Sequence, residues 1–215
     1  MHIPDGYISP ETAIATYAVA VPLWIYGFKK LKEKLSEETL PTLAALSALS
    51  FIIMMFNIPI PGGTSAHAVG AVAIAILFGP WVGFVSISLV LLIQAVVFGD
   101  GGLSAWAVNS LSMGFIGSFV GYYVFKLLKD KTKYAPFIAG YIGIVCSALF
   151  VGIVLGIQPI FWHQSNGHPL YFPFGLKVAI PAMLGAHLII GFVEGILTQI
   201  VYNLVGEKTE ERLAA

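Results

Sequence analysis

The sequence is short of charge and of cysteine, and both shortages narrow what the protein can be. Charged residues make up 10% of the 215 residues, whereas a soluble chain carries roughly 25%. The formal net charge is zero, so the basic surface that binds nucleic acid is missing and we expect no nucleic-acid partner. The single cysteine, Cys146, excludes a disulfide framework and a thiolate metal cage.

Motifs of the common hydrolytic enzymes are missing as well. The Gly-Glu-Lys-Thr stretch at 206–209 is too short for a Walker A phosphate loop, so we expect no ATP hydrolysis by this chain. No His-Glu-x-x-His sequence is present, which argues against a zinc protease. A serine protease needs a nucleophile beside a base, and His187 has no convincing serine motif to accompany it. We therefore expect a protein that is not an enzyme.

Apolar residues are abundant: they make up 58% of the chain, and the mean hydropathy is +0.88. They gather into seven stretches, most of which reach the roughly 20 residues that cross a bilayer when their flanks are counted. Glycines four residues apart, such as Gly117 and Gly121, indicate closely packed helices. We predict an all-α, multi-pass bundle of seven transmembrane helices in the cell (plasma) membrane, forming one domain over residues 1–215. The predicted spans are about 11–28, 41–56, 66–79, 81–98, 104–128, 134–157 and 176–205, after an extracellular arm of residues 1–10.

The positions of the basic residues predict the orientation. Ten of the eleven Lys and Arg residues follow the first, fifth or seventh stretch. Because basic loops stay in the cytoplasm, we expect the N-terminus outside and the C-terminus inside. Four of the five histidines then lie in outer segments, and the fifth, His187, lies roughly 15 Å into the last span from the outer side. Nitrogen ligands thus gather where a substrate arrives from outside.

The first two residues, Met1 and His2, offer three nitrogens in a row to a metal ion. The α-amine and the backbone nitrogen of His2 close a five-membered chelate ring, and the backbone nitrogen and Nδ1 close a six-membered one. A planar, nitrogen-rich array of this kind suits nickel(II) or copper(II) in square-planar geometry.

A fourth nitrogen can come from His67. The segment 57–67 contains two prolines and two glycines, which forbid a regular helix. The third predicted span, at 66–79, covers only about 21 Å of a hydrocarbon core about 30 Å thick. Irregular backbone at that depth must lie inside the protein, so we expect this loop to dip into the bundle with His67 at its tip. Residues 2–10 can stretch to roughly 26 Å, which lets Met1 and His2 reach it.

Polar residues near the outer ends of the predicted spans can support these ligands, because ligand histidines usually donate their other ring nitrogen to an oxygen. Two interpretations stay open for Asp100 and for Asp5, which can instead be turn residues only. His163 and His168 lie in a long outer loop that fits either a metal vestibule or an aromatic belt. Glu194, the only carboxylate deep in a span, is either a coupling residue or a partner for a neighbouring helix. The candidate supporting residues are Ser65, Gln94, Asp100 and Asn109.

The opening Met1-His-Ile-Pro-Asp-Gly6, followed by Ser9-Pro10 and later by Pro61-Gly-Gly-Thr-Ser-Ala-His67, resembles the CbiM/NikM family. These proteins are the substrate-capture (S) components of energy-coupling-factor (ECF) importers for cobalt and nickel, and the resemblance covers essentially the whole chain. It implies a metal site formed by the Met1 amine, His2 and His67, with Ni(II) as the transported substrate and Co(II) as the other candidate.

The resemblance also implies partners. These are a pair of cytoplasmic ATPase subunits, a transmembrane coupling (T) protein and a small additional membrane subunit. Capture components of this class commonly dock through small residues four apart on an early helix, and Ala44 and Ala48 look similar. The alternative function is a stand-alone transition-metal channel or a proton-coupled metal carrier, which would work without ATPases.

Overall fold

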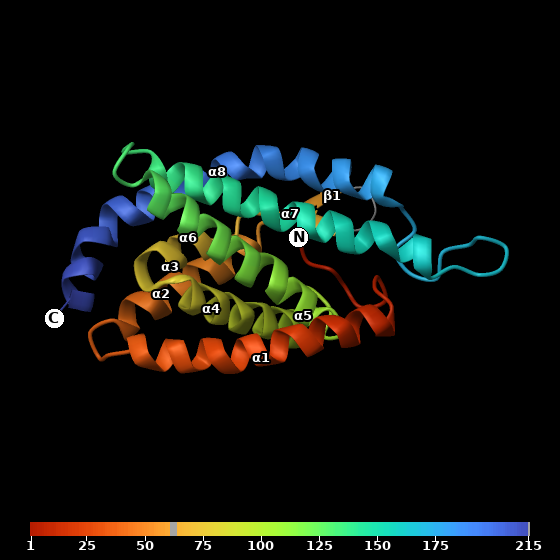
Figure 1. The fold of residues 1–215 in the computed structure, drawn as a ribbon, viewed down its shortest axis with the longest axis horizontal. Helices are drawn as coiled ribbons and strands as arrows, with labels where there is room; N and C mark the ends of the chain where they lie inside the picture. The colour runs from red at the N-terminus through yellow and green to blue at the C-terminus, as the bar shows by residue number, and fades with distance from the viewer. Residues whose placement is uncertain (61–63, 215) are drawn as a thin grey trace.

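The structure is a computed structural model that describes residues 1–60 and 64–214, with side chains described as far as Gly206. It is mostly helical, with one short β-hairpin (Figure 1). Helix α4 continues directly into the π-helical segment η1, and α5 runs through the π-helical segment η2 into α6. The elements are α1 (Pro10–Lys34), α2 (Leu40–Met54), β1 (Ile58–Ile60), β2 (Thr64–Ala66), α3 (Ala71–Phe78), α4 (Pro80–Ile93), η1 (Gln94–Phe98), α5 (Trp106–Asn109), η2 (Ser110–Ile116), α6 (Gly117–Leu128), α7 (Ala135–Phe161) and α8 (Leu176–Ala214).

Helix α3 forms the centre of the molecule. All eight of its residues are buried, and it packs against α4, α6, α7 and α8. Its Val72 lies so close to Gly121 on α6 that a Cβ atom on this glycine would overlap the valine side chain. Glycine is therefore required at Gly121 for the backbones of α3 and α6 to approach, as expected for helices packed in a membrane.

Within the described residues, four helical segments are long and apolar enough to cross a membrane, and α2 is a shorter apolar helix. Residues such as Ile189 and Phe192 on α8 expose large apolar side chains, which suits a lipid-facing surface. The prediction of a helical membrane protein is thereby confirmed, while the count of seven spans and the orientation stay predictions. The four segments are Pro80–Phe98, Trp106–Leu128, Ala135–Phe161 and Leu176–Gly206.

The segment before α3 is a hairpin, which the sequence did not lead us to expect. Strand β1 pairs with β2 in antiparallel register, with Ile58 opposite Ala66 and Ile60 opposite Thr64. Pro61, Gly62 and Gly63, part of the motif noted in the sequence, lie outside the described residues. His67 comes after β2, between the hairpin and α3, rather than at the tip of a loop. Within the expected span 66–79, the helix α3 begins at Ala71.

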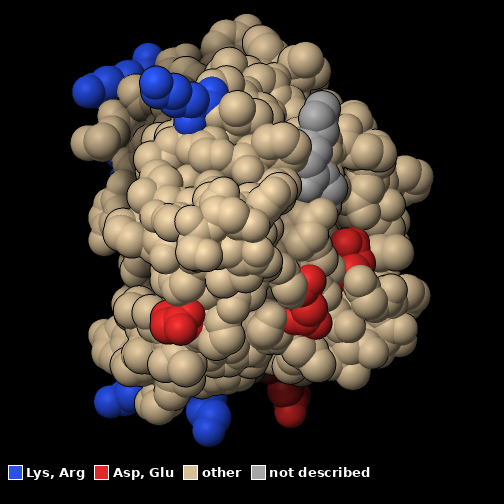
Figure 2. Space-filling model, turned by 90° about the vertical axis from the view of Figure 1, so that its right-hand side faces the viewer, with Lys and Arg blue, Asp and Glu red and all other residues tan. Residues whose placement is uncertain are grey.

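The two ends of the bundle differ in their connections and in charge. The α1–α2 connection, the α6–α7 connection and the C-terminus lie at the left-hand end in Figure 1, so the Lys-rich segments 29–34 and 126–133 share one end. The α7–α8 loop and the start of α1 lie at the other end. On that end, acidic atoms lie on a largely uncharged face, and Lys and Arg atoms appear at its upper and lower margins (Figure 2).

Candidate metal centre

The N-terminal arm, residues 1–9, runs from the end of the bundle that carries the α7–α8 loop back into its middle (Figure 1). It is held at alternate residues by hydrogen bonds to segments far along the chain. Ser9 also caps α1, because its hydroxyl accepts the backbone N–H of Thr12 at 3.1 Å. Ile3 bonds to Gly102 and Asn109, and Asp5 bonds to Leu103 and Ser104. Tyr7 bonds to Phe172, and Ser9 bonds to Gln158.

Asn109 binds the backbone of Ile3 through both polar atoms of its side-chain amide. Its Oδ1 accepts the backbone N–H of Ile3 at 3.0 Å, and its Nδ2 donates to the carbonyl of Ile3 at 3.1 Å. Gly102 N–H donates to the same carbonyl at 2.9 Å. The backbone immediately after the Met1-His2 dipeptide is therefore fixed, and Asn109 acts on the backbone beside the ligands rather than on a ligand.

Asp5 is more than the turn residue that its Pro-Asp-Gly context suggests. Its carboxylate accepts the backbone N–H of Ser104 at 2.8 Å, that of Leu103 at 3.2 Å and the Ser104 hydroxyl at 2.6 Å. The Ser104 hydroxyl holds the pKa of the Asp5 carboxyl below its usual value, and the two backbone donors act in the same direction. Gly102 lies so close to Asp5 that a Cβ atom there would overlap it, so the glycines of this loop allow the arm to dock.

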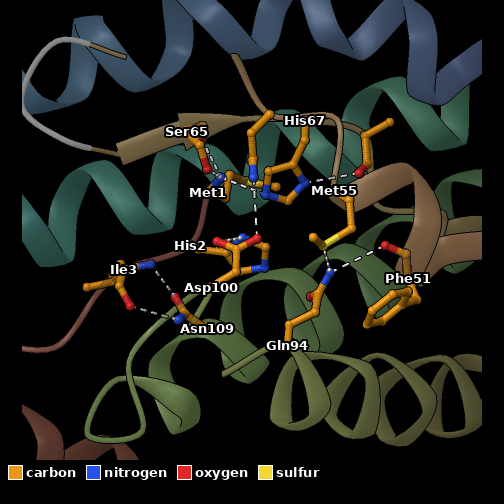
Figure 3. Close-up of polar contacts among 12 residues, drawn as sticks. Met1, His2, Ile3, Phe51, Met55, Ser65, His67, Gln94, Asp100 and Asn109 are labelled. Carbon is orange, nitrogen blue, oxygen red and sulfur yellow. Dashed lines mark hydrogen bonds and ion pairs between the residues drawn. The ribbon is translucent and has the colours of Figure 1, made fainter. Parts of the chain in front are cut away.

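The Met1 amine lies at the inner end of the arm and meets the backbone of β2. It donates to the carbonyl and, at 3.3 Å, to the hydroxyl of Ser65, and it lies 2.9 Å from Nε2 of His67 (Figure 3). The Met1 side chain has no exposed surface. Burial lowers the pKa of the Met1 amine to about 4, although the Asp100 charge acts in the opposite direction. At neutral pH the amine is therefore uncharged and keeps its lone pair.

His67 is 1% exposed, and its surroundings determine which nitrogen carries the proton. Its Nδ1 lies 3.0 Å from the carbonyl oxygen of Ala68. A carbonyl can only accept, so Nδ1 carries the hydrogen and Nε2 carries the lone pair. The lone pair points toward the Met1 amine, where a metal ligand would need it.

His2 is 4% exposed, and its ring stacks on that of His67 with centroids 4.6 Å apart and an interplanar angle of 22°. Its Nδ1 lies 3.1 Å from Oδ1 of Asp100 (Figure 3), close enough for an ion pair but outside hydrogen-bond geometry. Burial lowers the pKa of His2, and the Asp100 carboxylate opposes this change. The Nδ1 expected to close the chelate ring thus faces a carboxylate.

The four candidate supporting residues act on the Met1-His2 segment in different ways. Ser65 contacts the Met1 amine, Asp100 faces His2, and Asn109 holds Ile3. The buried Gln94, at the start of η1, donates from Nε2 to the carbonyl of Phe51 on α2 at 3.4 Å, and its side chain also lies against His2, where it opposes the lowering of the His2 pKa. Asp100 also accepts from Nδ2 of Asn57 at 3.3 Å, so its side chain joins His2 to the segment before the hairpin.

A surface cleft of about 300 Å³ leads to this cluster, and His2, Asn57, Ser65 and Asp100 are among its lining residues. Within the described residues, no three His, Cys, Asp or Glu side chains come together as a metal-ligand group. Any metal held here must therefore use the amine or backbone nitrogens as well as the imidazoles. This is the donor set expected from the Met1-His2 dipeptide.

Of the remaining candidate residues, His187 lies close enough to the Met1 amine and His67 for their charges to act on one another. His163 and His168 are exposed in the α7–α8 loop. His187 is buried on α8; its Nδ1 lies 2.8 Å from the Met183 carbonyl, and its Nε2 has no hydrogen-bond partner among the described residues. Ala44 and Ala48 are exposed on α2.

Glu194, also on α8, accepts hydrogen bonds from Val69 and Gly70, just after His67. The sequence contained a signal for this role, a lone carboxylate in an apolar span, but not the identity of its partner.

The fold defines a multi-pass helical membrane protein with a buried group of nitrogen atoms, from Met1, His2 and His67, at the inner end of its N-terminal arm. Residues 2–212 match the family described as CbiM, cobalt uptake substrate-specific transmembrane region. The chain belongs to this family, as its motifs predict.

Relatives and solved structures agree with this assignment. The chain is 45% identical over 209 residues to the fused nickel transport protein NikMN of Rhodobacter capsulatus, covering 92% of this chain and 59% of that one. It is 33% identical over 217 residues to the cobalt transport protein CbiM of Streptococcus sanguinis, covering 99% of this chain and 86% of the relative.

A crystal structure of a truncated transition metal transporter superposes with a TM-score of 0.93 at 46% identity, covering 97% of this chain and 99% of that one. By contrast, the chain spans less than two thirds of the length of the fused NikMN relative.

Proposed function

We propose that the protein is the substrate-capture component of an ATP-driven ECF importer and binds Ni(II), or Co(II), from outside the cell. One observation carries the proposal. The Met1 α-amine lies 2.9 Å from Nε2 of His67, with the His2 ring stacked alongside. Relatives named as nickel and cobalt transport proteins support the same choice of substrate.

The proposed site has four nitrogens: the Met1 amine, the backbone nitrogen and Nδ1 of His2, and Nε2 of His67. A planar nitrogen set favours nickel over magnesium, calcium and manganese, which prefer oxygen ligands. Because Nδ1 of His2 faces Asp100, closing the chelate requires the imidazole to turn away from this carboxylate. Cobalt(II) accepts more varied geometries, so the same ligands can serve it.

The arrangement of the chain supports capture from the outer side. The cleft beside His2 and Asp100 gives the metal a route to the ligands. The Lys-rich segments lie at the other end of the bundle (Figure 1), as they would if that end faced the cytoplasm. We propose seven spans with the N-terminus outside and the C-terminus inside, in one domain over 1–215.

Release of a buried metal requires energy that this chain does not supply. We propose that two cytoplasmic ATPase subunits act through a transmembrane coupling protein, together with a small additional membrane subunit. Ala44 and Ala48 on α2 are exposed and four residues apart, which would let a partner helix approach closely.

Nickel titration of the purified full chain tests the site. We expect one tight site per chain, with the absorption of a diamagnetic, square-planar Ni(II) centre. His67→Ala removes one of four ligands and should weaken binding by at least roughly 10-fold with little change in the helical circular dichroism. His168→Ala, in the exposed loop, is the matched control and should bind as the unchanged protein does. Equal binding by all three proteins would show that the site lies elsewhere.

Metal uptake by starved cells tests the transport mechanism. We expect accumulation of radioactive nickel only when the chain is expressed with the ATPase and coupling partners, and loss of accumulation with an inactive ATPase. Uptake by the chain alone would instead indicate a stand-alone channel or a proton-coupled carrier.

A further inference from the structure

We propose that Glu194 on α8 is a positioning residue for the metal site, which fixes His67 in the orientation and tautomer that present its Nε2 lone pair to the amine. This inference rests on the proposed function, because it assigns His67 as a ligand.

Glu194 is 1% exposed and lies in the apolar middle of α8. Its Oε2 accepts the backbone N–H of Val69 at 2.7 Å, and its Oε1 accepts that of Gly70 at 2.9 Å. These donors come just before the first turn of α3, where backbone N–H groups have no partner within the helix. A carboxylate 125 residues further along the chain satisfies them.

The same peptide unit connects Glu194 to His67. The N–H of Val69 and the carbonyl of Ala68 belong to one planar peptide group. Glu194 holds the N–H side of this plane, and Nδ1 of His67 donates to the carbonyl side at 3.0 Å. If the plane rotated, Nδ1 would lose its acceptor and the hydrogen could move to Nε2, where it would block the metal ligand. Glu194 thus acts on the ligand nitrogen through one rigid peptide group.

A capping role for α3 alone would use the same two hydrogen bonds, so the experiment must separate the two roles. Glu194→Gln keeps the size of the side chain but replaces one acceptor oxygen with a donor, and Glu194→Leu removes both acceptors. Thr198→Val is the matched control, because Thr198 is buried one turn further along α8 and its hydroxyl donates only to the carbonyl of Glu194.

Calorimetric titration with nickel chloride, in detergent, gives the first readout. We expect Glu194→Gln to weaken binding roughly 10-fold and Glu194→Leu roughly 100-fold, while Thr198→Val stays near the unchanged affinity. In a His67→Ala background, where the chelate of Met1 and His2 still binds, Glu194→Gln should cause no further loss. Equal losses in both backgrounds, or no loss in either, would overturn the inference. If Glu194→Leu does not fold, the isosteric Gln variant decides.

Nitrogen-15 spectra of histidine-labelled protein, without added metal, give the second readout. We expect His67 to show the Nδ1–H tautomer in the unchanged protein and a mixture of tautomers in both Glu194 variants. An unchanged His67 spectrum in these variants would also overturn the inference. If the unchanged protein binds no nickel, the proposed function fails, and these spectra still decide whether Glu194 orients His67.

Discussion

Moving the N-terminal amine is the most direct perturbation of the proposed site. We consider two glycines added ahead of Met1, which displace the amine by up to about 7 Å and turn the nitrogen of Met1 into an amide. A single added residue is a poorer choice, because it places histidine third in the chain, where an extra backbone nitrogen can complete a new chelate. The two-glycine extension leaves all side chains of the natural sequence unchanged.

The structure allows a magnitude to be worked out. The extension removes the amine's contacts with the Ser65 carbonyl, the Ser65 hydroxyl and Nε2 of His67. Each hydrogen bond contributes about 1 kcal/mol, so two or three lost contacts correspond to about 2–3 kcal/mol, or roughly 100-fold in affinity. Met1 has no exposed surface, so no space is available for the added residues in the docked arm.

Competition with a fluorescent nickel chelator measures this change on purified protein. The two glycines should form the end of a protease site that is cut directly before Met1, so that cleavage regenerates the free Met1 amine. We expect cleavage to restore the lost affinity, and a chain extended by two glycines at its C-terminus to bind normally. If the extended, uncleaved protein binds nickel within about threefold of the unextended one, a change of well under 1 kcal/mol, the amine is not a ligand and the argument from Met1 and His2 is refuted.

Three further outcomes follow from the arm and from α8. Asn109→Leu removes both side-chain hydrogen bonds to Ile3 and should weaken nickel binding roughly 10-fold in the same competition assay. Unchanged affinity would mean that the arm docks without these two hydrogen bonds. The pKa of Asp5 is lowered in the docked arm, so its contribution to stability is complete above its usual pKa and lost as the pH falls through the lowered one. The thermal midpoints of wild type and Asp5→Asn should therefore differ at neutral pH and converge once the pH falls below the lowered pKa of Asp5, whereas a constant difference would exclude the charge as the cause. His187→Leu replaces a buried ring whose Nε2 has no hydrogen-bond partner among the described residues. Because an unsatisfied buried group costs about 1–3 kcal/mol, the thermal midpoint of this variant should equal or exceed that of wild type. A marked fall would reveal a partner for Nε2.

The parts of the site that are predictable from sequence depend on local chemistry. The chelate geometry of Met1-His2 follows from bond connectivity, and the proline and glycine content of 57–67 excludes a helix before His67. Hydropathy and the positions of the lysines indicate a membrane bundle and its two ends. Each of these signals lies within a few residues of the feature that it predicts.

The unpredicted parts depend on contacts between distant segments. Asp5 reads as a turn residue, yet its partners lie 98 and 99 positions away. The acceptor role of Glu194 toward Val69 and Gly70 and the hairpin pairing of Ile58 with Ala66 have no local pattern either. Which distant groups meet is set by the packing of the whole bundle.

The alternate anchoring of the arm has a consequence for biogenesis. The arm leaves the ribosome before the helices that hold it, because Ile3 is held by a residue 106 positions later and Ser9 by one 149 positions later. The carbonyl of Tyr7 accepts from Phe172, in the loop before the last helix. The earliest-made residues must therefore wait, undocked, until most of the membrane helices have been inserted. The proposed metal site would then form only late in synthesis. An unfinished or misinserted copy in the membrane could not bind nickel from the medium.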